Sequence, residues 1–230
     1  MSGTVNGFGW LNSAEDLIKT VEELGFLPFF KNPVEGFSIA EHTPPEKWFV
    51  EGVEGPWEWK GPAARSGRCA YGKFFRGKSG YVSRELLPHF VNYRRDGYDY
   101  DARFDDGLMT SGDKSLLDIV YSEKSLLSTE LREMSGYGKN GQKGFDRVIT
   151  GLQMQTYVLA ADFEYPVNKN GREYGWGIAR YSSPESLFGA GLIRSCYKYR
   201  PEESFAFILD RLKKSLPGVE EKKIIKLISI

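Results

Sequence analysis

An α+β fold is predicted for this chain of 230 residues by three observations. Apolar residues recur at helical spacing in three successive segments between residues 113 and 152. From residue 157 to 165 they alternate with the residues between them, as in a half-buried strand, and a turn signal follows at residues 168–171 (Asn-Lys-Asn-Gly). Helix, helix, helix and hairpin is the order of a winged helix-turn-helix unit, and we expect two such units in tandem.

The three helices of this unit are predicted from capping residues and apolar spacing. Asp113 and Ser128 are good capping residues at the starts of the first two. The third, residues 144–152, has apolar residues at i, i+3, i+4 and i+7, which give it one buried face. The inward-facing residues are Leu116, Leu117 and Val120 in the first helix, Leu131 and Met134 in the second, and Phe145, Val148, Ile149 and Leu152 in the third.

The return strand of the hairpin contains Tyr174, Trp176 and Ile178, with Gly175 and Gly177 between them. The glycines leave one face of this strand bare. Either another molecule approaches the backbone there, or a neighbouring aromatic ring fills the space.

The elements before the unit begin with a helix that Ser13 caps and Gly25 ends. Residues 57–60 (Trp-Glu-Trp-Lys) alternate like a strand, and residues 69–83 read as a hairpin with a basic tip. A helix follows over residues 84–95. Beyond the unit, Ser183 and Pro201 begin further helices, and residues 220–230 form a last helix or strand.

These elements suggest three parts. Residues 1–112 hold the N-terminal helix and the basic region, residues 113–181 the winged helix-turn-helix, and residues 182–230 a helical segment that packs on the same core.

Composition excludes several classes of protein. No apolar run approaches the length of a membrane-spanning helix, and no leader is recognisable, so we expect a cytoplasmic protein that does not enter a membrane. Cys69 and Cys196 lack metal-ligand spacing, and the only histidines are His42 and His89. We therefore expect reduced thiols, no bound metal and no other cofactor.

The net charge is zero, yet the basic residues are clustered. From residue 58 to 95 the only acidic residues are Glu58 and Glu85. The basic residues of this segment are Lys60, Arg65, Arg68, Lys73, Arg76, Lys78, Arg84, Arg94 and Arg95. Five aspartates follow between residues 96 and 106. The segment is either a contact surface for phosphate groups or a solvated face paired with the acidic run. The candidate nucleic-acid contacts are Lys73, Arg76, Lys78, Arg84, Arg94 and Arg95 on one face, with Lys143 and Arg147 from the helix 144–152.

Two amides follow that helix directly, at Gln153 and Gln155. On a strand they point to the same side, because side chains alternate with a period of two. With this motif the chain resembles the AlkZ-type DNA glycosylases, and it looks like the shorter AlkZ-related proteins of bacteria. Segments 54–60, 93–99 and 174–177 add to the resemblance, which covers most of the chain for the shorter group and residues 113–181 for the glycosylases.

This resemblance implies tandem winged helices that bind DNA and remove alkylated or crosslinked bases in DNA repair. It implies a monofunctional glycosylase in which Gln153 and Gln155 position the attacking water. The true glycosylases are longer and have three winged helices. Two alternatives stand beside it: a noncatalytic winged-helix module that binds nucleic acid or a protein, and glutamines that only hydrogen-bond the neighbouring backbone. The sequence does not predict the oligomeric state.

Overall fold

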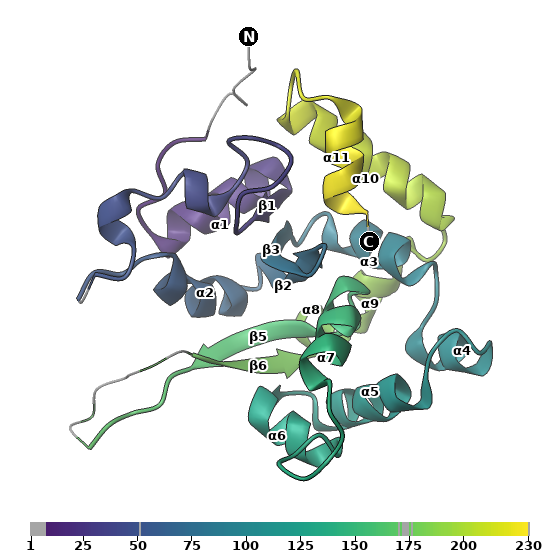
Figure 1. Cartoon of the computed structure of the whole chain (residues 1–230). Coiled ribbons are helices and arrows are strands. Elements are labelled where there is room, and N and C mark those ends of the chain that lie inside the picture. The colour runs from purple at the N-terminus through teal and green to yellow at the C-terminus, as the bar shows by residue number, and fades with distance from the viewer. Residues whose placement is uncertain (1–7, 51, 170, 172–174, 176, 230) are drawn as a thin grey trace.

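The computed structural model describes residues 8–50, 52–169, 171, 175 and 177–229 (Figure 1). Within them, strands β1 (Phe26–Pro28), β2 (Cys69–Phe75), β3 (Lys78–Ser83), β4 (Leu126–Leu127), β5 (Leu159–Glu164) and β6 (Ile178–Ser182) form one antiparallel sheet. The helices are α1 (Ala14–Leu24), α2 (Pro56–Arg65), α3 (Leu87–Arg95), α4 (Tyr100–Asp105), α5 (Ser111–Glu123), α6 (Ser128–Met134), α7 (Phe145–Met154), α8 (Pro184–Phe188), α9 (Ala190–Ile193), α10 (Pro201–Ser215) and α11 (Glu221–Ile228). Short 3-10 turns lie at Ile39–Glu41, Pro45–Lys47 and Arg194–Cys196. The chain is thus a mixed protein of helices and an antiparallel sheet.

The strand order β1-β3-β2-β5-β6-β4 repeats one pairing pattern in its two halves. In the first half β1 pairs with β3, which forms a hairpin with β2; in the second half β4 pairs with β6, which forms a hairpin with β5. The halves join where Tyr71 of β2 lies opposite Ala160 of β5. The sheet is therefore continuous between residues 1–112 and 113–181.

Helix α7 buries the face that its apolar spacing predicts. Phe145, Ile149 and Leu152 are buried and Val148 is half-buried. Its two predecessors differ in detail. Thr110, not Asp113, caps α5, and α6 begins at Ser128 because Glu130 accepts a hydrogen bond from the main-chain N–H of Leu127 at 2.7 Å.

Two predicted features of the fold are wrong. Met134 is 53% exposed, because α6 ends there and turns its last side chain outward. Residues 57–60 are helical, not extended. Pro56 at the first position of α2 favours a helix, and the Glu58 carboxylate accepts from the N–H of Gly55 at 2.8 Å, which caps the helix.

The predicted basic-tipped hairpin is present as β2 and β3. Its turn is two residues long, with positive φ at Arg76 (53°) and Gly77 (78°), the geometry that matches the twist of tight hairpins. The turn therefore projects the side chains of Arg76 and Lys78 beyond the end of the sheet.

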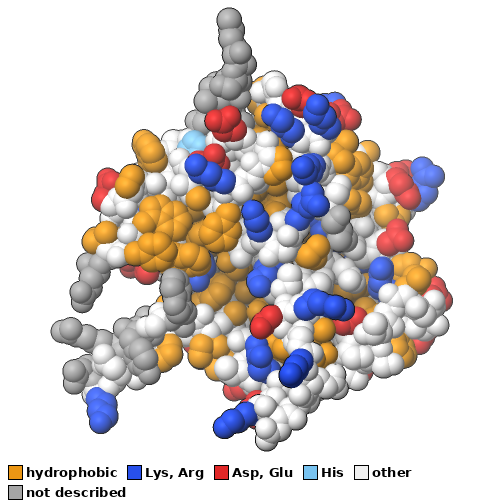
Figure 2. All heavy atoms as spheres, viewed as in Figure 1, with side chains coloured by type: hydrophobic (Ala, Val, Ile, Leu, Met, Phe, Trp, Pro, Cys, Tyr) orange, Lys and Arg blue, Asp and Glu red, His pale blue; other side chains and the backbone are white. Residues whose placement is uncertain are grey.

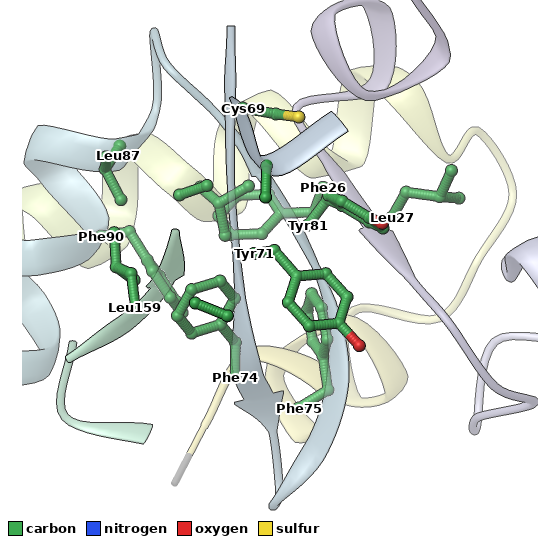
Figure 3. Close-up of a cluster of buried hydrophobic side chains, with 14 of the residues drawn as sticks. Phe26, Leu27, Cys69, Tyr71, Phe74, Phe75, Tyr81, Leu87, Phe90 and Leu159 are labelled. Atoms are coloured by element: carbon green, nitrogen blue, oxygen red, sulfur yellow. The ribbon is translucent and has the colours of Figure 1, made fainter. Parts of the chain in front are cut away.

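Aromatic side chains fix α3 against the first half of the sheet (Figure 3). The ring of Phe90 meets Phe26 of β1 edge-on at 5.2 Å and Phe74 of β2 at 5.5 Å between centroids. Burying each such ring stabilises the fold by about 1.5–3 kcal/mol. Helix α10 packs on α3, where Asn92 donates to the Ser204 hydroxyl at 2.9 Å, and α11 lies beside α10 at the C-terminal end (Figure 1).

Two further expectations concern the return strand of the hairpin and membrane-spanning helices. Tyr174 and Trp176, predicted on the return strand, lie outside the described residues, and β6 begins at Ile178. Within the described residues, no helix has both the length and the apolar character needed to span a bilayer.

Candidate nucleic-acid interface

The two glutamines do not lie on a strand, contrary to the prediction. Helix α7 continues through Gln153 and Met154, and Gln155 caps it in a helical conformation. Thr156, with φ of 63°, then turns the chain toward β5. The two side chains therefore do not share one side: Gln153 is 2% exposed, whereas Gln155 is half-buried.

Gln153 joins α7 to the first half of the sheet. Its Oε1 accepts from the main-chain N–H of Lys73 on β2 at 3.2 Å. Its buried Nε2 has no hydrogen bond of ordinary geometry to another described residue. Burial raises the pKa of the Tyr181 phenol to about 12, and the nearby Gln153 side chain opposes that rise. Gln153 thus contacts both hairpins of the sheet.

Replacing Gln153 with alanine should lower the free energy of unfolding by about 1–3 kcal/mol, because a buried main-chain N–H loses its acceptor. The same change at the half-buried Gln155 should alter it by about 0.5 kcal/mol or less. Urea unfolding of both variants measures this difference. Equal stabilities would contradict the structural role of Gln153.

Basic residues from the hairpin and α7 come together. Lys73 Nζ donates to the Thr150 hydroxyl at 3.2 Å. The turn packs on α7, since a Cβ on Gly77 would lie 3.5 Å from Thr150 and 3.9 Å from Met154. Arg147 lies three residues before Thr150 and so shares its face. Lys143 precedes this helix and is exposed.

A groove of about 320 Å³ extends this cluster toward the C-terminus. Arg76 and Lys78 line it together with Lys31 and Lys226. Sequence patterns alone do not reveal Lys31 and Lys226 as members of this cluster, because almost two hundred residues separate them and no local motif marks either. Figure 2 shows Lys and Arg side chains in a band down the middle of this face. We call Lys31, Lys73, Arg76, Lys78, Lys143, Arg147 and Lys226 the basic surface.

The cations of the basic surface lack acidic partners. The ion pairs among the described residues engage other lysines and arginines, and none includes a residue of the basic surface. The acidic run at residues 96–106 does not neutralise it: Asp99 pairs with Arg194 and Asp101 with Lys114. Of the two interpretations of the basic segment, the geometry therefore favours a contact surface for an anion.

Arg94 and Arg95 do not lie on that surface, and the prediction that they do is wrong. Arg94 is buried and donates to the carbonyls of Phe74 and Met154 at 2.8 and 3.1 Å. Arg95 is fully buried and pairs with Glu185 at 2.5 Å. Both lie in the last turn of α3, which the aromatic core directs inward, so neither is available to phosphate.

Arg84 is exposed but lies elsewhere. It follows the end of β3 that is remote from the hairpin turn. Because a strand rises about 3.3 Å per residue, Arg84 lies roughly 20 Å from Lys78. Its guanidinium donates to the carbonyl of Gly67 at 3.1 Å, and it lines a different pocket with Glu22 and Glu85. Arg84 therefore does not share one face with Arg76 and Lys78.

A second feature is an aromatic pocket beside α2, with a volume of about 590 Å³. Phe49, Trp57 and Tyr165 line it together with Lys60, which is 6% exposed. Trp57 lines this pocket, whereas Trp59, Tyr71, Phe74 and Tyr81, aromatic residues that follow it in the sequence segment 59–81, are buried in the core. From the sequence, Lys60 is recognisable only as part of a basic segment.

No metal centre is evident: the part of the chain that the structure describes contains no group of three or more His, Cys, Asp or Glu side chains able to hold an ion.

Comparisons with known proteins give three findings. The model of a protein family described as AlkZ related matches residues 11–229. None of the curated proteins matches the chain. A solved structure, the DNA glycosylase AlkZ of Streptomyces sahachiroi, is similar at 14% sequence identity and a TM-score of 0.48, over 97% of this chain and 60% of that one. The chain thus spans about 60% of the length of that protein.

Proposed function

Because this chain belongs to the AlkZ-related family, we propose that it is a DNA-binding protein that excises alkylated bases as a DNA glycosylase. It would act in DNA repair in the cytoplasm of a bacterium. Membership of the family supports the proposed class of reaction, and the basic surface supports the proposed place of DNA binding.

The observation that supports this proposal most is the set of unpaired cations on one surface. They come from separate segments: Lys31, the β2–β3 hairpin, the start and outer face of α7, and Lys226 of α11. Because the net charge of the chain is zero, long-range attraction to DNA is weak. Binding then depends on this local cluster, which would release counterions from the phosphates it contacts.

The proposal includes tandem winged helices. The order α5, β4, α6, α7, β5, β6 is that of a winged helix, in which α7 is the helix that enters a groove and the β5–β6 hairpin is the wing. The first half has the order α1, β1, α2, β2, β3, with the one α-helix α2 where the second half has α6 and α7, and β1 pairs with β3 as β4 pairs with β6. This repeat supports a unit within residues 1–112, a second within 113–181, and the helical segment 182–230 packed on both.

For catalysis, the proposal assigns the glutamine pair to the attacking water. Gln155 is the member that reaches solvent, and Gln153 holds α7 against β2 behind it. An alkylated purine is cationic and leaves readily, so an oriented water and stabilisation of the developing positive charge supply most of the catalysis needed.

The proposed function is tested by incubating the protein with duplex DNA that contains N-methylated purines and measuring released base by mass spectrometry. We expect release by the wild-type protein and a loss of about 100-fold in the single-turnover rate of Gln155→Ala, at unchanged stability. A matched control is Gln142→Ala, an exposed amide before α7. Wild-type rates in Gln155→Ala would contradict the role of this residue.

A second function, a noncatalytic DNA-binding module, is favoured by one observation: Gln153 is buried and its oxygen already accepts a hydrogen bond. This alternative predicts that the protein binds DNA with salt-dependent affinity and releases no base from any of the alkylated duplexes.

A further inference from the structure

Lys60 is a buried lysine that has no counter-ion among the described residues. Its ammonium lies 4.5 Å from the ring centroid of Trp57 and 4.3 Å from that of Phe163. No ion pair or hydrogen bond joins it to another of the described residues. Cation–π contacts are weaker than the hydration of an ammonium group, so burial here disfavours the charged form.

The electrostatic surroundings agree with that geometry. Burial lowers the pKa of Lys60 to about 8, and the negative charge of Glu58 opposes the shift. Glu54 also lines the pocket, while Arg65 and Asp162 pair with each other between α2 and β5, as Arg180 and Glu164 do between β6 and β5. At pH 7 about a tenth of Lys60 is therefore an uncharged amine, the form that attacks a carbonyl carbon.

The pocket is suited to a small sugar beside a DNA strand. Its volume of about 590 Å³ is that of a small-molecule site. It also adjoins the basic surface, because the ring of Phe30, which lines the basic groove, lies 6.4 Å from the ring of Trp57. In Figure 2 hydrophobic side chains gather next to the basic band. A DNA strand bound to the basic surface can thus place one nucleotide in the aromatic pocket.

We propose that Lys60 forms a Schiff base with the C1′ aldehyde of an abasic deoxyribose and cleaves the DNA strand on its 3′ side by β-elimination. This proposal rests on the proposed DNA binding and adds a lyase step to base excision. Base excision generates an abasic site, so the step would consume the product of the glycosylase reaction.

The atoms balance without an oxidant or reductant. The Lys60 amine adds to C1′, and the carbinolamine takes up a proton from the solvent and loses water to form a protonated imine. The C2′–H bond then breaks, with the proton passing to the Glu54 carboxylate or to water. A C2′=C3′ double bond forms, and the C3′–O bond breaks to release a 5′-phosphate. Water hydrolyses the imine, which returns Lys60 and an unsaturated aldehyde.

Borohydride trapping on a duplex with one abasic site tests the proposal, because reduction of the imine links protein to DNA covalently. We expect a crosslinked band with wild-type protein and with Lys47→Met, a half-buried lysine that does not line the pocket. Lys60→Met and Lys60→Arg should give no band, although circular dichroism and DNA affinity remain those of the wild type. Peptide mapping should place the link at Lys60.

Trapping of Lys60→Met at the wild-type level would overturn the proposal. Wild-type protein that binds abasic DNA without being trapped would also overturn it, while leaving the proposed function intact. A protein that binds no DNA would overturn both.

The pH profile distinguishes chemistry from a purely structural role. The rate of trapping should rise with pH and level off above about 8, where Lys60 is neutral. Glu58→Gln keeps an acceptor for the cap of α2 but removes the charge that raises the pKa of Lys60, so its profile should move to lower pH. An unchanged profile in Glu58→Gln, or a flat wild-type profile, would contradict the assignment.

Discussion

Replacing Arg95 with methionine should lower the free energy of unfolding by about 3–5 kcal/mol, because it leaves Glu185 as an unpaired charge in the interior. Arg95 is 0% exposed. Its guanidinium pairs with Glu185 and donates to the Tyr197 hydroxyl at 3.0 Å and to the carbonyl of Thr156 at 2.9 Å. Removing it therefore also leaves that carbonyl without a donor.

Urea unfolding measures this effect, and Arg84→Met is the matched control. Arg84 is exposed, so its loss should cost about 0.5 kcal/mol or less. The double variant Arg95→Met/Glu185→Leu should recover part of the loss, because it removes the orphaned charge. Equal stabilities of Arg95→Met and Arg84→Met would contradict the buried ion pair.

The ion pair of Arg95 and Glu185 also makes the free energy of unfolding depend on pH in the acidic range. Burial alone would raise the pKa of Glu185, but the charge and hydrogen bonds of Arg95 outweigh it and lower that pKa below its usual range. The stabilisation is therefore fully present above the unfolded value of about 4.3 and is lost as the pH falls through the folded value. The difference in stability between wild-type protein and Arg95→Met/Glu185→Leu should accordingly shrink in acid.

Neutralising three cations of the basic surface should weaken DNA binding strongly. For Arg76→Gln/Lys78→Gln/Arg147→Gln, the slope of log K against log salt should decrease in magnitude by about 3, and affinity at 0.1 M salt should fall about 100- to 1000-fold. Each side chain is exposed and forms no ion pair with another described residue, so folding should be unaffected. Fluorescence anisotropy of a labelled duplex over a salt series measures both quantities.

The control for that experiment removes as much charge elsewhere. Arg200, Lys213 and Lys214 lie on or beside α10 and pair with Glu203, Glu221 and Asp210. Their triple replacement by Gln should leave the slope unchanged. An equal loss of affinity in both triple variants would show that net charge, rather than the basic surface, governs binding.

The sequence predicts best those parts of this fold that depend on local chemistry. The buried face of α7 follows from the spacing of Phe145, Ile149 and Leu152, because that spacing specifies one side of a helix wherever it packs. The hairpin turn at Arg76 and Gly77 likewise depends on neighbouring residues.

The predictions are wrong where contacts with distant segments of the chain determine whether a side chain is buried. Arg94 and Arg95 look exposed at the end of a basic helix, yet their partners Phe74, Met154 and Glu185 come from three other parts of the chain. Helix α7 extends beyond its predicted end at Leu152. No glycine or proline follows Leu152 to stop it, and the chain turns at Thr156, a residue that seldom adopts a positive φ.

The candidate sites likewise combine local features, which the sequence reveals, with contacts between distant segments, which it does not. Residues 73–78 could be recognised as basic from their composition, but their junction with Lys31 and Lys226 depends on how α11 and the segment after β1 pack around the hairpin. The reactivity of Lys60 depends on its burial against Trp57 and Phe163, and Phe163 lies on the other half of the sheet.

Lysine footprinting of the DNA complex tests the central claim, that the basic surface is where DNA binds. The wild-type protein is acetylated with and without duplex DNA, and the modification of each lysine is measured by mass spectrometry. We expect DNA to protect the exposed lysines of the basic surface, Lys31, Lys78, Lys143 and Lys226, and to leave Lys19, Lys213 and Lys214 unchanged. Protection of the second group, or equal modification of both groups with and without DNA, would contradict the account.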